Sequence, residues 1–340
     1  MVTIREIAKA AGVSAAAVSR VLNNDTSLSV SAATRQTILE TAEALQYVTP
    51  RNRKGGTRAM PRRGEGPLAQ VFTAAPEEEF SDPYYLGVRF GIEARCRELG
   101  IETRRLYEID SNNELASLAD ARGIVIVTGH RTEKVDWLCQ TFANVAIVGV
   151  RGADHVDSVT VDLQGAMQRV LLDIHALGYR RIGYVGGPDR SYLETRPRSE
   201  ERAVSFIRTM TELGLFDPAL FLVSDHLLDF QSGHDLTLSL FASGNMPELL
   251  ITGNDSMAIG AYRALHECGL KIPDDISVVS FNDIPAAQFM VPSLSTLKIY
   301  SEFLGMAGVD LVMERLAGRD IAKRVTIATE MIWRESSRRP

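Results

Sequence analysis

From residue 68 onward, short apolar runs alternate with segments in which apolar residues recur every three or four positions. The short runs are often β-branched, as buried parallel strands are. They predict strands at Leu68–Ala75, Glu102–Tyr107, Gly123–Val127, Val145–Val148, Arg181–Val185, Glu248–Thr252 and Ile276–Phe281. The segments between them predict helices at Tyr85–Leu99, Leu163–Leu177, Arg202–Leu213 and Ser256–Cys268. Alternation of this kind indicates βαβ units and parallel sheets.

The body formed by these elements is too long for a single core. About 270 residues exceed the usual size of one domain, so we expect two doubly wound α/β subdomains. The strand Ser158–Val161 predicts the first crossover between them, and Ser295–Ile299 predicts the return, followed by a helix near Glu302–Leu316 and a last strand, Val325–Ile332. Subdomain one is then expected at about 68–158 and 299–320, and subdomain two at about 162–295 and 321–335.

The first 24 residues follow a different pattern, two short amphipathic helices on either side of Gly12. Thr3 begins the first helix as a cap, with Glu6 three residues later as a capping box requires. Gly12 is expected in the left-handed conformation that ends a helix. Ser14 then caps a second helix, whose inward face is formed by Val18, Val21 and Leu22. This layout is typical of a helix-turn-helix.

The other face of the second helix carries the candidate base-reading residues Ala15, Ala16, Ser19, Arg20 and Asn23. Small side chains permit close approach to base edges and thymine methyl groups, and arginine pairs with guanine O6 and N7. An ordinary helical hairpin with a solvated polar face is the alternative interpretation.

The charge distribution favours contact with DNA. Residues 1–63 contain ten Lys and Arg against four Asp and Glu, although the whole chain has a net charge of −6. A basic end on an acidic body indicates that the end alone contacts a polyanion. A third helix is expected from Ser31 to Gln46, which completes a DNA-binding domain at 1–48. The linker at 49–67 places Arg51, Arg53 and Lys54 along phosphates, unless it is a solvated tether.

The run A-G-V-S-x-x-x-V-S-R-V-L-N, from Ala11 to Asn23, resembles the signature of the lactose-repressor (LacI/GalR) family of bacterial transcription regulators, and Tyr47 fits its L-x-Y segment. The resemblance extends over essentially the whole chain. It implies a periplasmic-binding-protein-like body and base selection by positions 15, 16 and 20. Ala17 replaces the usual threonine of the family, and Gly55 stands where a hinge leucine wedges into the minor groove.

Ligands of open α/β sheets bind beyond the carboxyl ends of the strands, and this rule selects three loops. The first carries Asp82, Tyr84 and Tyr85, whose rings suit a sugar face; a surface turn is the alternative. The other two loops carry the polar groups Asn254, Asp255, Asn282 and Asp283, with Phe281 at the end of its strand. For Asp255, a role as helix N-cap is the favoured interpretation.

The resemblance supports the same loops. The N-D pair of the family matches Asn254 and Asp255, its final ligand carboxylate aligns with Asn282, and its effector arginine aligns with Arg202, which is otherwise a surface charge. Gly149 stands where sugar-binding relatives often have aspartate. The segments S-D-P-Y-Y and N-D-I-P resemble repressors of β-galactosidase operons, which implies a galactoside or a related sugar.

Other functions have little support in the sequence. Cys96, Cys139 and Cys268 lack metal-binding spacing and suggest a reducing cytoplasm. We expect no cofactor, no metal, no catalytic residue and no membrane segment. A non-regulatory sugar-binding module of the periplasmic type is the main alternative, and a sugar-processing enzyme is the third. We therefore predict a cytoplasmic, nucleoid-associated homodimer that binds a double-stranded operator and releases it when a sugar binds.

Overall fold

The computed structural model describes residues 8–22, 34, 37–38, 41, 66–76, 78–107, 118–129, 131–187, 200–224 and 228–338. The chain divides into two compact units, residues 1–62 and residues 63–340, and each is described by itself. None of the described helices is long and apolar enough to cross a membrane.

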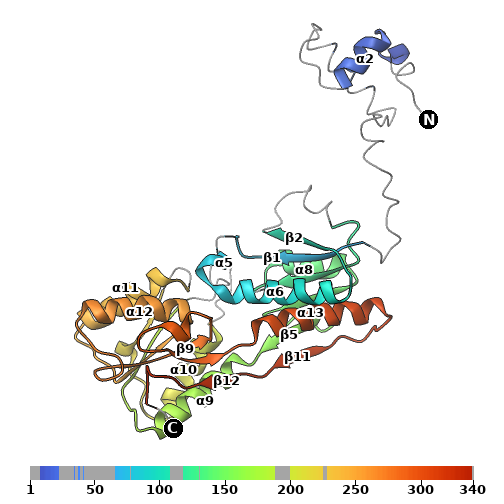
Figure 1. Ribbon diagram of the computed structural model, residues 1–340. Coiled ribbons are helices and arrows are strands. Elements are labelled where there is room, and N and C mark those ends of the chain that lie inside the picture. The colour runs from blue at the N-terminus through green and yellow to red at the C-terminus, as the bar shows by residue number, and fades with distance from the viewer. Residues whose placement is uncertain are drawn as a thin grey trace. The chain divides into compact units, whose positions relative to one another are not determined.

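The N-terminal unit contains the predicted turn between two helices. Residues 8–10 are helical, Gly12 has a φ of 66°, and helix α2 follows at Ala15–Leu22 (Figure 1). The hydroxyl oxygen of Ser14 accepts a hydrogen bond from the amide of Ala17 at 3.2 Å, which confirms its predicted role as N-cap. Val18 and Val21 are buried, as the apolar pattern predicts.

The larger unit is built on two six-stranded sheets (Figure 1). Sheet one has the order β11 (Arg324–Ile327), β5 (Asp157–Val161), β4 (Val145–Val148), β3 (Gly123–Val127), β1 (Leu68–Phe72), β2 (Thr103–Tyr107). Sheet two has the order β12 (Glu330–Ile332), β10 (Ser295–Lys298), β9 (Ser277–Asn282), β8 (Leu249–Thr252), β6 (Ile182–Gly186), β7 (Phe221–Val223). The described pairs are parallel apart from β10 and β12, which are antiparallel. The predicted parallel architecture is confirmed.

The C-terminal strand differs from its prediction. The expected strand Val325–Ile332 is two strands, since β11 pairs with β5 in sheet one and β12 pairs with β10 in sheet two. Assigning the whole segment 321–335 to subdomain two was therefore wrong for β11. The hydrophobic pattern predicts a strand but does not specify which sheet edge it joins. The chain thus passes between the sheets three times, after β5, after β10 and after β11.

Helices cover the sheets: α5 (Glu78–Ser81), α6 (Pro83–Glu98), α8 (Glu133–Thr141), α9 (Leu163–Ala176), α10 (Glu201–Glu212), α11 (Phe230–Ala242), α12 (Asp255–Glu267) and α13 (Ser301–Leu316). Of these, α5, α8 and α11 were not predicted. Helices α6 and α13 run side by side (Figure 1). They approach so closely that a Cβ on Gly305 would lie 2.1 Å from the carbonyl oxygen of Val88. Only glycine fits there, and this contact fixes α6, which begins at the candidate site.

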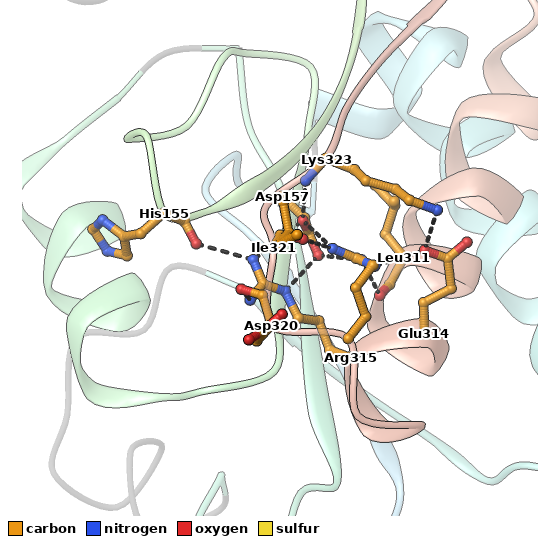
Figure 2. Close-up of polar contacts among 9 residues, drawn as sticks. His155, Asp157, Leu311, Glu314, Arg315, Asp320, Ile321 and Lys323 are labelled. Atoms are coloured by element: carbon orange, nitrogen blue, oxygen red, sulfur yellow. Dashed lines mark hydrogen bonds and ion pairs between the residues drawn. The ribbon is translucent and has the colours of Figure 1, made fainter.

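A buried carboxylate joins β5 to the end of α13. Asp157 has no exposed surface and accepts hydrogen bonds from Arg315 (Nε, 2.9 Å), Arg319 (Nη2, 2.7 Å) and the amide of Lys323 (2.6 Å). Figure 2 shows Arg315 and the segment around Lys323 converging on Asp157. Because Lys323 immediately precedes β11, this cluster places β11 beside β5.

A cavity of about 520 Å³ adjoins this cluster, lined by His155, Arg315, Asp320 and residues at the end of α8. It lies at the starts of β4 and β5, whereas the candidate effector residues follow strand ends. The guanidinium of Arg315 is bound to Asp157 and to the carbonyl oxygens of His155 and Asp320 (Figure 2). The cavity therefore offers no uncompensated cation.

Candidate effector site and DNA-binding unit

The candidate effector residues lie where strands end and helices begin. Asp82 precedes α6, and its Oδ1 accepts a hydrogen bond from the amide of Tyr84 at 3.1 Å, so it caps the helix. Asn254 follows β8 and caps α12 in the same way, through the amide of Met257 at 2.9 Å. Asn282 ends β9 in the left-handed region, with a φ of 118°. Local backbone requirements thus hold Asp82 at the start of α6 and the two asparagines at the ends of β8 and β9.

Asp82 joins the two sheets' loops directly. Its Oδ2 accepts a hydrogen bond from Nδ2 of Asn254 at 3.0 Å, and its Oδ1 accepts one from Nδ2 of Asn282 at 3.2 Å. The residue belongs to the loop after β1 in sheet one, while its two partners follow strands of sheet two. The amide of Asn254 also donates to the carbonyl oxygen of Leu228 at 2.9 Å. This bridge brings together residues about 200 positions apart.

Arg202 forms the second part of the site. It is buried in the first turn of α10, where its Nε donates to Glu200 at 2.6 Å and its Nη1 donates to the carbonyl oxygen of Gly253. Its guanidinium carbon lies 5.8 Å from the ring centroid of Phe281, which is fully buried. Glu200 also accepts a hydrogen bond from the hydroxyl of Tyr184 at 3.1 Å. The candidate effector residue Arg202 is therefore neutralised by a neighbouring carboxylate.

The electrostatics of the site reflect burial opposed by hydrogen bonding. Burial raises the pKa of Asp82 above its ordinary value, and the amide of Tyr84, the side chains of Asn254 and Asn282, and the charge of Arg202 oppose this rise without cancelling it. Both carboxylate oxygens accept from N–H donors, which suits the ionised form. Burial also raises the pKa of the Tyr84 hydroxyl, so this residue stays neutral and can donate a hydrogen bond. The centroid of its ring lies 5.3 Å from that of Tyr85, and the two rings are arranged edge to face.

The structure gives Asp255 and Asp283 other tasks. The N-cap of α12 is Asn254, so the interpretation of Asp255 as the cap was wrong. Asp255 points inward and accepts from the hydroxyl of Thr296 at 2.7 Å and the amide of Ile284 at 2.8 Å; burial raises its pKa to about 7. Asp283 is bound by Arg334 at 2.7 Å. Both carboxylates are occupied by protein donors.

Sequence reasoning missed several residues of this site. Glu200 caps α10 by accepting a hydrogen bond from the amide of Ala203, but glutamate is not among the residue types that usually cap helices, so its position gave no signal. Tyr184 gave no signal either, since its role depends on contact between β6 and α10. Thr73 and Thr128, at the ends of β1 and β3, share a hydrogen bond of 2.9 Å. That pairing follows from strand order, which the sequence does not state.

The candidate DNA-binding residues are only partly covered by the structure. Ser14 is exposed at the start of α2, and Ala15, Ala16, Ser19 and Arg20 lie within this helix, with Arg20 exposed. Thr3, Asn23, Arg51, Arg53 and Lys54, and nearly all of the linker at 49–67, lie outside the described residues.

Comparisons with known proteins agree with this organisation. Residues 3–50 match the model of bacterial regulatory proteins of the lacI family, and residues 173–337 match a periplasmic binding protein-like domain. The sequence is 32% identical to the transcriptional repressor MelR of Bacillus subtilis (strain 168), over 99% of this chain and 97% of that protein. It is 53% identical to the lactose operon repressor of Rhizobium radiobacter over 110 residues, which cover 32% of this chain and 97% of that sequence.

Solved structures show the same fold. A complex of the transcriptional regulator CelR with cellobiose has a TM-score of 0.69 at 23% identity, over 99% of this chain and 100% of that chain. A lac repressor dimer bound to operator and the anti-inducer ONPF has a TM-score of 0.67 at 23% identity, over 98% of each chain.

A helix-turn-helix unit joined to a two-sheet ligand-binding body defines the class of ligand-responsive DNA-binding regulators. The chain belongs to the LacI family of bacterial regulatory proteins. It is a transcriptional regulator, and the alternative of a non-regulatory sugar-binding module is not supported.

Proposed function

We propose that this regulator is a repressor that binds an operator as a homodimer and releases it when a sugar enters the body between the two sheets. The observation that carries the proposal is the Asp82 bridge, because it places polar side chains of both sheets at one point. A ligand at this point contacts both halves of the body. It changes DNA affinity only as far as it prefers one arrangement of the halves over the other.

The choice of a sugar rests on side-chain chemistry and on the relatives. Asn254, Asn282 and Asp82 offer hydrogen-bond donors and acceptors with which sugar hydroxyls can pair, and Tyr84 and Tyr85 add aromatic faces. Relatives include the transcriptional regulator GalR of Lacticaseibacillus casei and a lactose operon repressor, and a related structure holds cellobiose. Galactosides are therefore the first class to test. No catalytic role is proposed, and the site of action is the bacterial nucleoid.

The test is a mobility-shift assay of the full-length protein on its own upstream DNA, with galactose, lactose, melibiose and cellobiose added separately. We expect a shifted complex that at least one sugar dissolves. The absence of a shift on every upstream fragment would contradict the repressor proposal. A shift that no sugar affects would contradict only the proposed effector class.

Within the DNA-binding unit, we propose that Arg20 reads a base edge while Ser14, Ala15, Ala16 and Ser19 permit close approach, with Thr3, Asn23, Arg51, Arg53 and Lys54 as phosphate or base contacts. Replacing Arg20 with Ala is expected to weaken operator binding by about 1–3 kcal/mol, because one bidentate pair with guanine is lost. Binding to unrelated DNA should change far less. Equal losses on both DNAs, measured by titration at fixed salt, would refute the base-reading role.

Exposed apolar side chains support the homodimer. The side chains of Phe289 and Val291 are 78% and 91% exposed. This segment is joined to α12, because the hydroxyl of Tyr262 donates a hydrogen bond to the carbonyl oxygen of Pro292 at 3.2 Å. Exposed apolar residues that lie next to one another mark interaction surfaces, and Phe289 and Val291 are close neighbours in the sequence. Val291→Lys is expected to shift the protein toward monomers and to weaken operator binding, as seen by size measurement and mobility shift. A dimer of unchanged strength would exclude this loop from the interface.

A further inference from the structure

We propose that Asp82 selects the effector, so that the cleft accepts uncharged sugars and rejects phosphorylated or acidic ones. This inference rests on the proposed function as a sugar-responsive regulator. It concerns how the site discriminates among sugars, and it starts from the charges that the structure places there.

The guanidinium of Arg202 is already paired within the protein. Glu200 binds Nε of Arg202 at 2.6 Å, and both side chains are largely buried, with exposed fractions of 11% and 10%. The carbonyl oxygen of Gly253 takes Nη1. A buried guanidinium that is already paired with a carboxylate has little attraction left for an anionic ligand. Arg202 therefore acts as a hydrogen-bond donor at this site rather than as an anion receptor.

The charge that remains at the bridge is that of Asp82. Arg202 and Glu200 compensate each other, and the two oxygens of Asp82 accept from three N–H donors, which favours the ionised carboxylate, so Asp82 is left as the net charge among the described residues at the bridge. Its partners there, Asn254 and Asn282, are neutral amides. A phosphate or carboxylate brought to this point would face like charge in a partly desolvated setting, which costs free energy.

A ligand at this point must replace the hydrogen bonds between Asp82 and the two asparagines. Asp82 lies 3.0 Å from Nδ2 of Asn254 and 3.2 Å from Nδ2 of Asn282, so a ligand group must take the place of these contacts. A sugar hydroxyl can donate to the carboxylate and accept from the amide at once. Two hydroxyls would satisfy Asp82 and both asparagines. An anionic group supplies acceptors only, so it would replace neither asparagine donor and would leave Asp82 with the amide of Tyr84 alone.

The test uses isothermal titration calorimetry on the full-length protein with matched probes: galactose, lactose and melibiose against galactose 6-phosphate and galacturonate. Wild-type protein is expected to bind at least one neutral sugar at least about tenfold more tightly than the anionic probes. One unfavourable contact to a charged group lowers affinity by about this factor. Asp82→Asn should bind that neutral sugar at least about tenfold more weakly and should reduce the discrimination against the anions.

The variant design separates selection from folding. Asparagine is as good an N-cap as aspartate, so Asp82→Asn keeps the start of α6. Asp217→Asn is the matched control, because Asp217 also caps a helical turn through its side chain but lies outside the bridge. Unfolding curves of both variants check stability, and operator binding without sugar checks the proposed function independently.

Wild-type affinity for galactose 6-phosphate or galacturonate equal to that for the neutral sugars would overturn the inference. So would unchanged neutral-sugar binding by Asp82→Asn, or a panel in which only anions bind or none bind. Each of these outcomes leaves the operator-binding part of the proposed function intact, provided that the sugar-free protein still shifts its DNA.

Discussion

The adjacent side chains of Asn254 and Asp255 point in different directions and make different contacts. Asn254 faces Asp82 and the other sheet, whereas Asp255 is turned into the core toward Thr296 and Ile284. The difference follows from the helix start, since the N-cap residue stands outside the helical turn while the next residue enters it. The aspartate beside the candidate effector residue Asn254 thus serves to fix the loops after β8 and β9.

The raised pKa of Asp255 predicts a pH dependence of stability. Burial moves this pKa to about 7, above its ordinary value of 3.8, so the folded protein keeps a proton that the unfolded chain has lost. The free energy of unfolding should therefore fall as pH rises between these values, by up to about 1.4 kcal/mol per pH unit from this group. Asp255→Asn is expected to flatten the slope between pH 5 and 7 in urea unfolding experiments. An unchanged slope would exclude Asp255 as its source, and Asp217→Asn should keep the wild-type slope.

At the residue scale, sequence reasoning selected most of the candidate site. Asp82, Asn254 and Asn282 were found because polar residues at strand ends are easily recognised. Glu200 and Tyr184 were missed because their role arises from contact between α10 and β6, which no local pattern encodes. The same holds for the inward turn of Asp255, which depends on Thr296 in another strand.

At the scale of elements, the central feature is the connection from α13 to β11. Asp157 anchors it through Arg315, Arg319 and the amide of Lys323 (Figure 2). Burial alone would raise the pKa of Asp157, but the hydrogen bonds from Arg319 and Arg315 outweigh it and lower the pKa. The ionised carboxylate therefore stabilises the fold above its ordinary pKa, and this contribution is lost as acid protonates it.

Asp157→Asn should lower the free energy of unfolding at pH 7 by about 3–5 kcal/mol, because Arg315 loses its counter-charge and, among the described carboxylates, Arg319 keeps only Glu314. The deficit should shrink as pH falls toward the pKa of the wild-type carboxylate, where the wild type loses the same contribution. Asp154→Asn is the matched control, since Asp154 pairs with Arg324 but is 95% exposed, and we expect a loss below about 1 kcal/mol. Denaturant unfolding of both variants measures the difference, and equal losses would contradict an anchoring role for Asp157.

Elements with a strong pattern were predicted well and short ones were not. The boundaries of β3 and β4 coincide with the predicted strands, because both are uninterrupted apolar runs. Helix α8 has only nine residues and β7 only three, too few for a periodic signal. The division of the last strand into β11 and β12 depends on pairing with distant edges, so the local sequence does not specify it.

At the scale of the whole molecule, the account connects a sugar site in one unit with DNA binding by another. Such a connection is a coupling free energy, typically about 1–3 kcal/mol, and it is reciprocal. If sugar weakens operator affinity by a given factor, operator must weaken sugar affinity by the same factor. The relation holds whatever path carries the coupling.

The most direct test of this account measures that reciprocity with the sugar that best dissolves the operator complex. Operator affinity is titrated with and without saturating sugar, and sugar affinity is titrated with and without saturating operator DNA. We predict two equal ratios in the range of about 5–150-fold. Sugar affinity that is the same for free and operator-bound protein would contradict the central claim that one sugar-binding body controls the DNA-binding unit.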